Sequence, residues 1–252
     1  MAHDIDFIIH GDDMQAVQIE LDPAEAVRAE IGAMLSMEEG IEMQTSAEGG
    51  IFTGLKRIVS GENFFITSFL NNGNVKRAVT FAAPFPGKII PLNLAELGGS
   101  FLCQRDSFLC AAQGVEISVE FTKRLGAGFF GGEGFILQRL SGDGKVFIHA
   151  GGTVLKKELK ANERLRVDTG CLVAFQPSVD YDIQFVGGFK NVLFGGEGLF
   201  LAQLTGPGVV YLQTLPFSRL ADRIISASGW VGRKDETRGI GGLLGGFISG
   251  QK

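Results

Sequence analysis

Two glutamates that stand between glycines are the residues best placed to do chemistry. Glu133 lies in the segment Phe130-Gly-Gly-Glu-Gly134, and Glu197 lies in the matching segment Phe194-Gly-Gly-Glu-Gly198. A carboxylate displayed on a glycine turn could contact a ligand or a protein partner. It could also accept hydrogen bonds from the amides of its own turn, and this structural role is the default expectation for such a motif.

Other motifs of catalysis or cofactor binding lack the context that they need. Gly126-Ala-Gly-Phe-Phe-Gly131 matches a dinucleotide fingerprint. However, the chain continues into an apolar run typical of a strand, instead of a helix whose N-terminal amides could hold a pyrophosphate. The sequence has no Gly-x-Ser-x-Gly elbow and no phosphate-binding P-loop. We therefore expect no cofactor and no catalytic residue.

The histidines and cysteines are too few and too scattered for a metal centre. A barrel enzyme with a metal needs several imidazoles that converge. The chain has only His3, His10 and His149, and we expect them to be exposed or hydrogen-bonded. Its cysteines are odd in number and form no Cys-x-x-Cys pair, which indicates reduced core thiols: Cys103, Cys110 and Cys171.

Composition favours a folded protein rich in turns and strands. Hydrophobic residues make up 45% of the 252 residues, with 37 glycines and 21 phenylalanines. Glycine suits tight turns, and aromatic residues suit a half-buried pleated surface. The net charge of −5 and the lack of long basic runs disfavour a nucleic-acid partner.

Nothing in the sequence predicts export or a membrane span. The first residues, Met1 to Asp6, carry acids where a secretory signal carries bases, and no apolar run approaches the length of a spanning helix, about 18 residues. We therefore expect a cytoplasmic protein.

Self-comparison reveals an internal repeat. The segment 130–148 matches 194–212 at five glycines, and the similarity continues upstream, where 107–114 resembles 170–177. That alignment places Cys110 opposite Val173 and His149 opposite Gln213, so that both are expected to fill structural positions. A weaker third copy lies in front, because 32–38 resembles 170–176. Chains with such a period build one structural unit per copy.

Each copy contains a predicted hairpin. Apolar runs flank Ser-Gly-Asp-Gly at 141–144, Thr-Gly-Pro-Gly at 205–208 and Ser-Gly-Glu-Asn at 60–63, which are turn residues. Some strands alternate in polarity, as in 17–21 and 115–121, which predicts one exposed face. Others, such as 135–137 and 146–148, are apolar throughout, as expected of strands covered on both faces.

These patterns predict an all-β protein with one domain over residues 1–230. Its repeats should span about 5–80, 81–152 and 153–216. A helix is expected over 217–228, because Phe217, Leu220, Ile224 and Ile225 recur at helical spacing, and we expect this stripe to dock on the β domain. Residues 231–252 form a Gly-rich tail that we expect to be flexible, and contact between this tail and a membrane stays open.

The glycine pattern also carries a resemblance. The stretches 54–65, 83–87 and 130–142 resemble a family of uncharacterised bacterial proteins related to the fungal "altered inheritance of mitochondria" biogenesis factors, over most of residues 5–230. This resemblance implies a fold similar to the Trp RNA-binding attenuation protein, repeated three times as a double-stranded β-helix or sandwich. It implies no catalytic residues.

Three functions follow as hypotheses. The first is a non-enzymatic binding or scaffold protein that acts as a homo-oligomer, with a trimer as the first expectation and a dimer as the second. It rests on strands that are apolar on both faces, whose surface a single chain would leave exposed. The second is an enzyme of unfamiliar type that uses acids of the repeat turns. The third is RNA binding, which rests on fold analogy alone and conflicts with the acidic charge.

Overall fold

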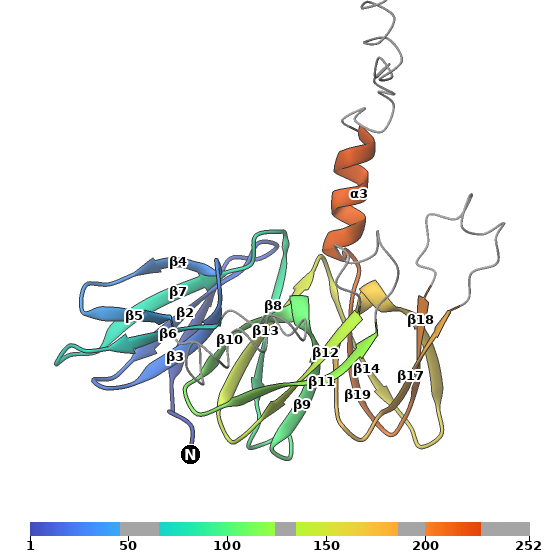
Figure 1. Cartoon of the computed structure of the whole chain (residues 1–252), viewed down its shortest axis with the longest axis horizontal. Helices are drawn as coiled ribbons and strands as arrows, with labels where there is room; N and C mark the ends of the chain where they lie inside the picture. Colours follow the sequence, from blue (N-terminus) through green and yellow to red (C-terminus); the bar gives the residue numbers. More distant parts are fainter. Residues whose placement is uncertain (46–65, 124–134, 186–199, 228–252) are drawn as a thin grey trace, which may run out of the picture. The chain divides into compact units, whose positions relative to one another are not determined.

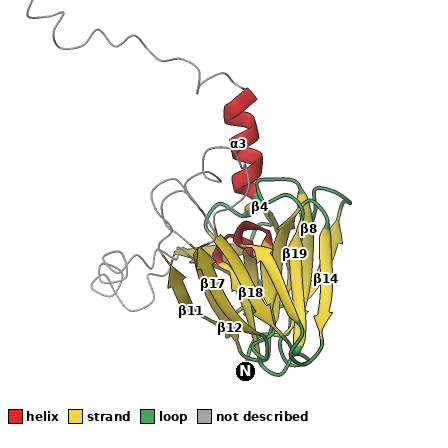
Figure 2. Ribbon diagram, turned by 90° about the vertical axis from the view of Figure 1, so that its right-hand side faces the viewer, coloured by secondary structure: helices red, strands yellow, loops and turns green. Residues whose placement is uncertain are grey.

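The computed structural model describes residues 1–45, 66–123, 135–185 and 200–227, most of which form β-strands (Figures 1 and 2). A β body spans Met1–Pro216, and Phe217–Lys252 form a separate unit. The expectation of an all-β fold is therefore confirmed. Within the second unit, residues Phe217–Ala227 form α3, close to the expected bounds, while the tail at 231–252 lies outside the described residues. Docking of α3 on the β body stays a prediction.

After a first strand, β1 (Asp6–His10), the body consists of three successive sets of strands. The first set contains β2 (Ala16–Leu21), β3 (Ala26–Glu30), β4 (Met34–Met37), β5 (Ile41–Thr45), β6 (Ile66–Asn71) and β7 (Arg77–Ala82). The second contains β8 (Gly87–Asn93), β9 (Ser100–Gln104), β10 (Phe108–Ala112), β11 (Glu116–Lys123), β12 (Phe135–Ser141) and β13 (Lys145–Gly151). The third contains β14 (Val154–Leu159), β15 (Arg164–Asp168), β16 (Leu172–Phe175), β17 (Asp180–Phe185), β18 (Phe200–Thr205) and β19 (Gly208–Gln213).

The strands of each set pair in the same order. The first, sixth and third strands form one antiparallel row, as in β2-β7-β4, β8-β13-β10 and β14-β19-β16. The second, fifth and fourth strands form another, as in β3-β6-β5, β9-β12-β11 and β15-β18-β17. The same strand order therefore occurs three times along the chain.

Neighbouring sets are joined edge to edge. The second strand of one set pairs antiparallel with the third strand of the next, β3 with β10 and β9 with β16. We call these two pairings the junctions. Each junction merges two three-stranded rows into a six-stranded sheet, β5-β6-β3-β10-β13-β8 or β11-β12-β9-β16-β19-β14. The remaining rows form the four-stranded sheet β1-β2-β7-β4 and the three-stranded sheet β15-β18-β17.

Local details recur at corresponding positions. The third strand of each set has a bulge before Ser36, Cys110 or Ala174 where it pairs with the sixth strand. The backbone takes a positive φ before each second strand, at Ala24, Gly98 and Asn162. Glycine suits this conformation best, and Asn tolerates it better than most residues.

Side-chain hydrogen bonds recur as well. The Glu38 carboxylate accepts from the Ala78 amide at 3.0 Å, and the Gln176 side-chain oxygen accepts from the Val209 amide at 2.8 Å. These bonds link the third and sixth strands of the first and third sets in the same way. The matching bulges of β10 and β16 place Cys110 opposite Ala174. The sequence alignment, which placed Cys110 opposite Val173, was therefore wrong by one residue.

Hydrophobic side chains pack between the sheets and across the junctions. In β2, Val17, Ile19 and Leu21 are buried and alternate with partly exposed polar residues. One core cluster includes residues of all three sets, and a second combines the third set with Leu102, Phe135 and Leu137 of the second. The sets therefore share their cores.

The hairpin predicted around residues 60–63 lies outside the described residues and stays a prediction. The turn between the fifth and sixth strands of the first set is formed by residues 72–76. Asn71 begins this turn and corresponds to Gly142 in the second set, since their amides donate to Glu25 and Gly99 respectively. Sequence comparison did not identify the turn at 72–76 because Asn-Asn-Gly-Asn does not resemble the Ser-Gly-Asp-Gly turn of the second set.

Candidate functional site

The two glutamates singled out by sequence, Glu133 and Glu197, lie outside the described residues, as does the glycine segment 126–131. Their roles therefore stay predictions. The chemistry of the described residues is found at the histidines, the cysteines, the carboxyl of Glu30, a pocket beside the first residues and the exposed strand edges.

The three histidines do not come together. The Nδ1 atom of His3 accepts a hydrogen bond from the Ala26 amide at 2.9 Å, and Nε2 of His10 lies 3.3 Å from Oε1 of Gln18. His149 lies within β13. Across the described ranges, no group of three or more His, Cys, Asp or Glu side chains is arranged to hold a metal ion.

His149 differs from the expectation that each histidine would be exposed or hydrogen-bonded. Its side chain is buried, its Nδ1 has no hydrogen-bond partner among the described atoms, and its ring meets Phe85 edge to face at 4.6 Å. Burial lowers the pKa of His149 to about 4 because the charged imidazolium would lose its hydration. It is a neutral core residue at physiological pH.

Gln213 occupies the corresponding position in the third set and is fully bonded. Its side-chain oxygen accepts from the Gly151 amide, and its nitrogen donates to the Gly170 carbonyl, both at 2.7 Å. The same position is therefore filled by a polar group that binds backbone in one set and by a buried imidazole in another.

The cysteines are core residues. Cys103 and Cys110 are buried and Cys171 is half-buried, and none of the three is part of a disulfide bond. Burial raises the pKa of the Cys103 and Cys110 thiols well above the ordinary value, so both remain protonated. A protonated thiol is a poor nucleophile, which argues against cysteine catalysis at these positions.

Glu30, at the end of β3, has a shifted carboxyl. Loss of hydration and then the charge of Asp106 raise its pKa to about 7, while Arg105 opposes the shift. Its side chain is nevertheless exposed, and contact with water limits the effect of lost hydration. The neighbours that act on it are the carboxylate of Asp106, which raises the pKa, and the guanidinium of Arg105, which lowers it.

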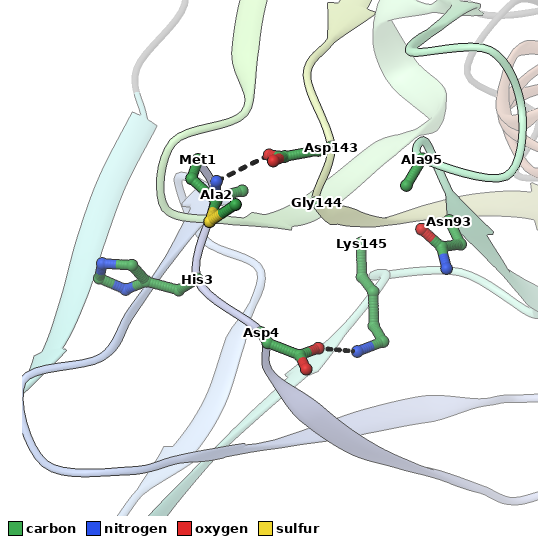
Figure 3. Close-up of a pocket in the computed structure, with 9 residues that line it drawn as sticks. All are labelled: Met1, Ala2, His3, Asp4, Asn93, Ala95, Asp143, Gly144 and Lys145. Carbon is green, nitrogen blue, oxygen red and sulfur yellow. Dashed lines mark hydrogen bonds and ion pairs between the residues drawn. The ribbon is translucent and has the colours of Figure 1, made fainter.

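A pocket of about 280 Å³ lies where the first residues of the chain pack against the turn before β13 (Figure 3). The Ala2 amide donates to Asp143 Oδ1 at 2.7 Å, and Lys145 Nζ lies 2.5 Å from Asp4 Oδ1. The hydrogen bond from Ala2 lowers the pKa of Asp143. Both carboxylates of this pocket thus have partners, Asp143 a backbone amide and Asp4 the ammonium of Lys145, and the contacts fix the start of the chain.

The edge of β4 is the clearest exposed apolar surface of the β body. Leu35 is 65% exposed, whereas the residues at the corresponding bulge, Leu109 and Val173, are 2% and 0% exposed. Met37 is 43% exposed, whereas Ala111 and Phe175 are fully buried. The difference arises because β10 and β16 each pair with the second strand of the preceding set, whereas β4 pairs only with β7 among the described strands.

The edge of β15 is the complementary case. β3 and β9, the second strands of the first two sets, pair with a third strand of the next set, whereas β15 pairs only with β18 among the described strands. Arg164 and Arg166 are exposed on this strand. Together, β4 and β15 are the two strands at which the recurring junction is missing.

The sequence of the chain is similar to those of known proteins over most of its length. The sequence family described as "Mitochondrial biogenesis AIM24" matches residues 7–215, which is most of the chain. The chain belongs to the AIM24 family. An uncharacterized protein of Streptococcus pyogenes serotype M6 is 28% identical over 213 residues, covering 81% of this chain and 83% of the relative.

The fold of this AIM24 member also matches a solved structure. The crystal structure of a Streptococcus pyogenes protein aligns with a TM-score of 0.75 at 24% identity, covering 88% of this chain and 99% of that chain. At this identity the match supports the fold alone. No helix among the described residues is long and apolar enough to cross a membrane.

Sequence reasoning missed the β4 and β15 edges, although a signal was present. The alignment of 32–38 with 170–176 marked β4 as a third strand. What that alignment lacked was the pairing rule between sets, because strand order cannot be read from a repeat. Without that rule, β4 looks like any other apolar strand.

Proposed function

We propose that this AIM24 family member is a non-enzymatic binding or scaffold protein that works through its surface as a homo-oligomer. One observation carries the proposal: the β4 edge exposes Leu35 and Met37 at positions whose counterparts are buried in the other two sets. Exposed apolar surface at a strand edge favours pairing with another chain.

The chemistry of the described residues supports a binding role over catalysis. The buried thiols are held protonated by a raised pKa, and the buried His149 is held neutral by a lowered one. A nucleophile needs a positioned base, and the hydrogen bonds of His3 and His10 connect them to a backbone amide and a glutamine instead.

The prediction that strands apolar throughout, such as β12 and β13, need cover from another chain is wrong. Phe135 and Leu137 of β12 and Val146 and Phe147 of β13 are fully buried within the single chain. The exposed apolar edge of β4 now carries the argument, with a trimer as the first expectation and a dimer as the second.

Light scattering on the purified protein at micromolar concentration tests the assembly. We expect a mass that is a multiple of 27.0 kDa. Affinity capture of the tagged chain followed by mass spectrometry tests the binding role, with the chain itself and at least one further protein expected. Catalytic conversion of a small molecule by the purified protein, with many turnovers per chain, would contradict a non-enzymatic role.

Glu133 and Glu197 remain candidate contacts for a partner or ligand. The double variant Glu133→Gln/Glu197→Gln keeps the shape of both side chains and removes both charges. If these carboxylates contact a partner, the captured protein should be lost while the mass of the oligomer stays unchanged. Unchanged capture would instead support the structural role of the two side chains within their glycine turns.

A further inference from the structure

The pairing that joins neighbouring sets is missing at two strands of the β body, β4 and β15. In both junctions, the second strand of one set pairs antiparallel with the third strand of the next, β3 with β10 and β9 with β16. Among the described residues, no set follows the third one to pair with its second strand, β15, and no set precedes the first one to pair with its third strand, β4. These are the two halves of a further junction.

Other open edges of the body are of a different kind. The fourth strands, β5, β11 and β17, end their sheets in every set, so an open edge is their normal state. β8 contains Pro91, which has no amide hydrogen, and β14 carries Lys156, Lys157 and Glu158. Proline and charge protect strand edges from pairing. β4, with the sequence Met-Leu-Ser-Met, carries neither.

The register of the missing junction can be transferred from the two that exist. Cys110 pairs with Ala29 in the first junction, and Ala174 pairs with Cys103 in the second. Cys110 and Ala174 both follow the bulge of a third strand, as Ser36 does in β4. The counterpart of Ala29 and Cys103 in β15 is Val167, since Ala29, Cys103 and Val167 face Thr67, Gln138 and Ala202 on the fifth strands.

We propose that β15 of one copy pairs antiparallel with β4 of a second copy, head to tail, with Val167 opposite Ser36 and Arg166 opposite Met37. The merged sheet has the order β17-β18-β15-β4-β7-β2-β1. Its first six strands, β17 to β2, repeat the arrangement of the two six-stranded sheets within the chain. The inference deepens the proposed scaffold role, and rests on it, by naming the surface through which copies assemble.

The residues along this seam are complementary. The register places Arg164 opposite Glu39, so that opposite charges face each other at one end. Arg166 corresponds to Arg28, whose guanidinium crosses the first junction and donates to the Val115 carbonyl at 3.2 Å. An arginine at this place is therefore compatible with a formed junction. The same pairing covers Leu35 and Met37.

The pairing uses different surfaces on the two copies, so every added copy presents a fresh β4 and a fresh β15. Such head-to-tail contacts close into rings when the rotation between copies permits it. A symmetric contact of β4 with β4 would need no contribution from β15. This difference gives the experiment its decisive variant.

Charge substitutions on each side of the seam test the pairing. Met37→Arg places two cations opposite each other, and Arg166→Glu places a carboxylate diagonally beside Glu39. Each variant should raise the dissociation constant at least about tenfold and shift the mass at micromolar concentration toward 27.0 kDa. The matched control is Met43→Arg, which puts the same charge on an equally exposed methionine of β5. It should keep the mass of the wild type.

Mixing the variants separates head-to-tail pairing from a symmetric contact. The Met37→Arg chain keeps an intact β15, and the Arg166→Glu chain keeps an intact β4, so an equimolar mixture should associate again. A wild-type chain that stays at 27.0 kDa overturns the assembly, yet leaves partner capture as a separate test of the binding role. An Arg166→Glu chain that keeps the full mass overturns the head-to-tail arrangement.

A cross-link checks the register without depending on a loss of assembly. Oxidation of the Ser36→Cys/Val167→Cys chain should give covalent multimers on a non-reducing gel, because residues directly opposite in an antiparallel pair have close Cβ atoms. The control Met43→Cys/Val167→Cys should remain a single band. Equal multimer formation by both double variants would contradict the register.

Discussion

β4 and β10 hold the same place in two neighbouring sets, yet one is exposed and the other is buried. Both are third strands, both carry the same bulge, and both are apolar. Every residue of β10 is buried because β3 pairs with its free edge, whereas three of the four residues of β4 are exposed. The comparison shows that the neighbouring set, and not the composition of the strand, decides how much of it is buried.

The largest effect is expected where the junction is already formed. Ala111→Glu introduces a carboxylate at a fully buried position of β10, and should cost about 4 kcal/mol or more in free energy of unfolding. The control, Met37→Glu, changes the corresponding residue of β4 and should cost less than about 0.5 kcal/mol. Urea unfolding measures the stability of both variants, at a protein concentration low enough to avoid association of the chains. Equal losses would show that the β4 edge is buried in the isolated chain.

Substitution of Asn71 should give the next largest loss of stability, because this residue begins a turn that a glycine begins in the other two sets. Its side-chain nitrogen donates to the Leu21 and Val75 carbonyls at 2.8 and 2.9 Å, and its oxygen accepts from the Gly73 amide at 3.0 Å. Asn71→Ala should cost about 2 to 3 kcal/mol, since it leaves buried backbone groups unpaired.

Thermal unfolding of Asn71→Ala beside Asn72→Ala provides the measurement. Asn72 bonds to Glu42 at the surface, so its loss should change stability by less than about 0.5 kcal/mol. If both variants unfold at the same temperature as the wild type, the hydrogen bonds of Asn71 do not stabilise the first set.

His149 should make stability depend on pH, in contrast to Gln213 at the same place in the third set. The unfolded chain binds a proton near the ordinary histidine pKa of 6.5, whereas the folded chain does so only near 4. Stability should therefore fall by up to about 3 kcal/mol as the pH drops from 6.5 to 4, and level off below. Urea unfolding across this range should show a smaller slope for His149→Gln. An unchanged slope would assign the effect to other groups.

Much of the architecture could be predicted from residue patterns. Alternating polarity in β2 and turn residues around β12 and β13 predicted strands, and helical spacing predicted α3. These signals are local, because each depends on residues close together in the chain. The bulges also explain the one-residue error in aligning Cys110, since an inserted residue in a strand leaves no mark in composition.

The exposed edges could not be predicted because pairing between sets is not local. β4 and β10 look alike in sequence, and only the position of β3 beside β10 separates them. The burial of β12 and β13 depends in the same way on neighbours from other parts of the chain. For this reason, a strand that is apolar throughout is no evidence of cover by another copy, and the edge that lacks cover leaves no mark in the sequence.

The smallest expected effect concerns an ion pair that distinguishes the second set from the third. Arg139 holds Glu120 with two hydrogen bonds of 2.8 Å across β11 and β12, whereas the counterpart of Arg139 in β18 is Gln203. Both charged side chains are about one-third exposed, so solvent screens the pair. The hydrogen bond from Arg139 lowers the pKa of Glu120, and its contribution is therefore lost as the pH falls through that lowered value.

A double-mutant cycle with Glu120→Gln and Arg139→Gln isolates the coupling between the two side chains. We expect less than about 1 kcal/mol at neutral pH and low salt, and less still in 1 M salt, because screening weakens the attraction between exposed charges. Arg139→Gln also recreates the residue of the third set, so this variant should fold normally. A coupling of several kcal/mol that persists in high salt would instead mean that the pair is sealed from solvent, and that the outer edge of the second set is covered by another chain.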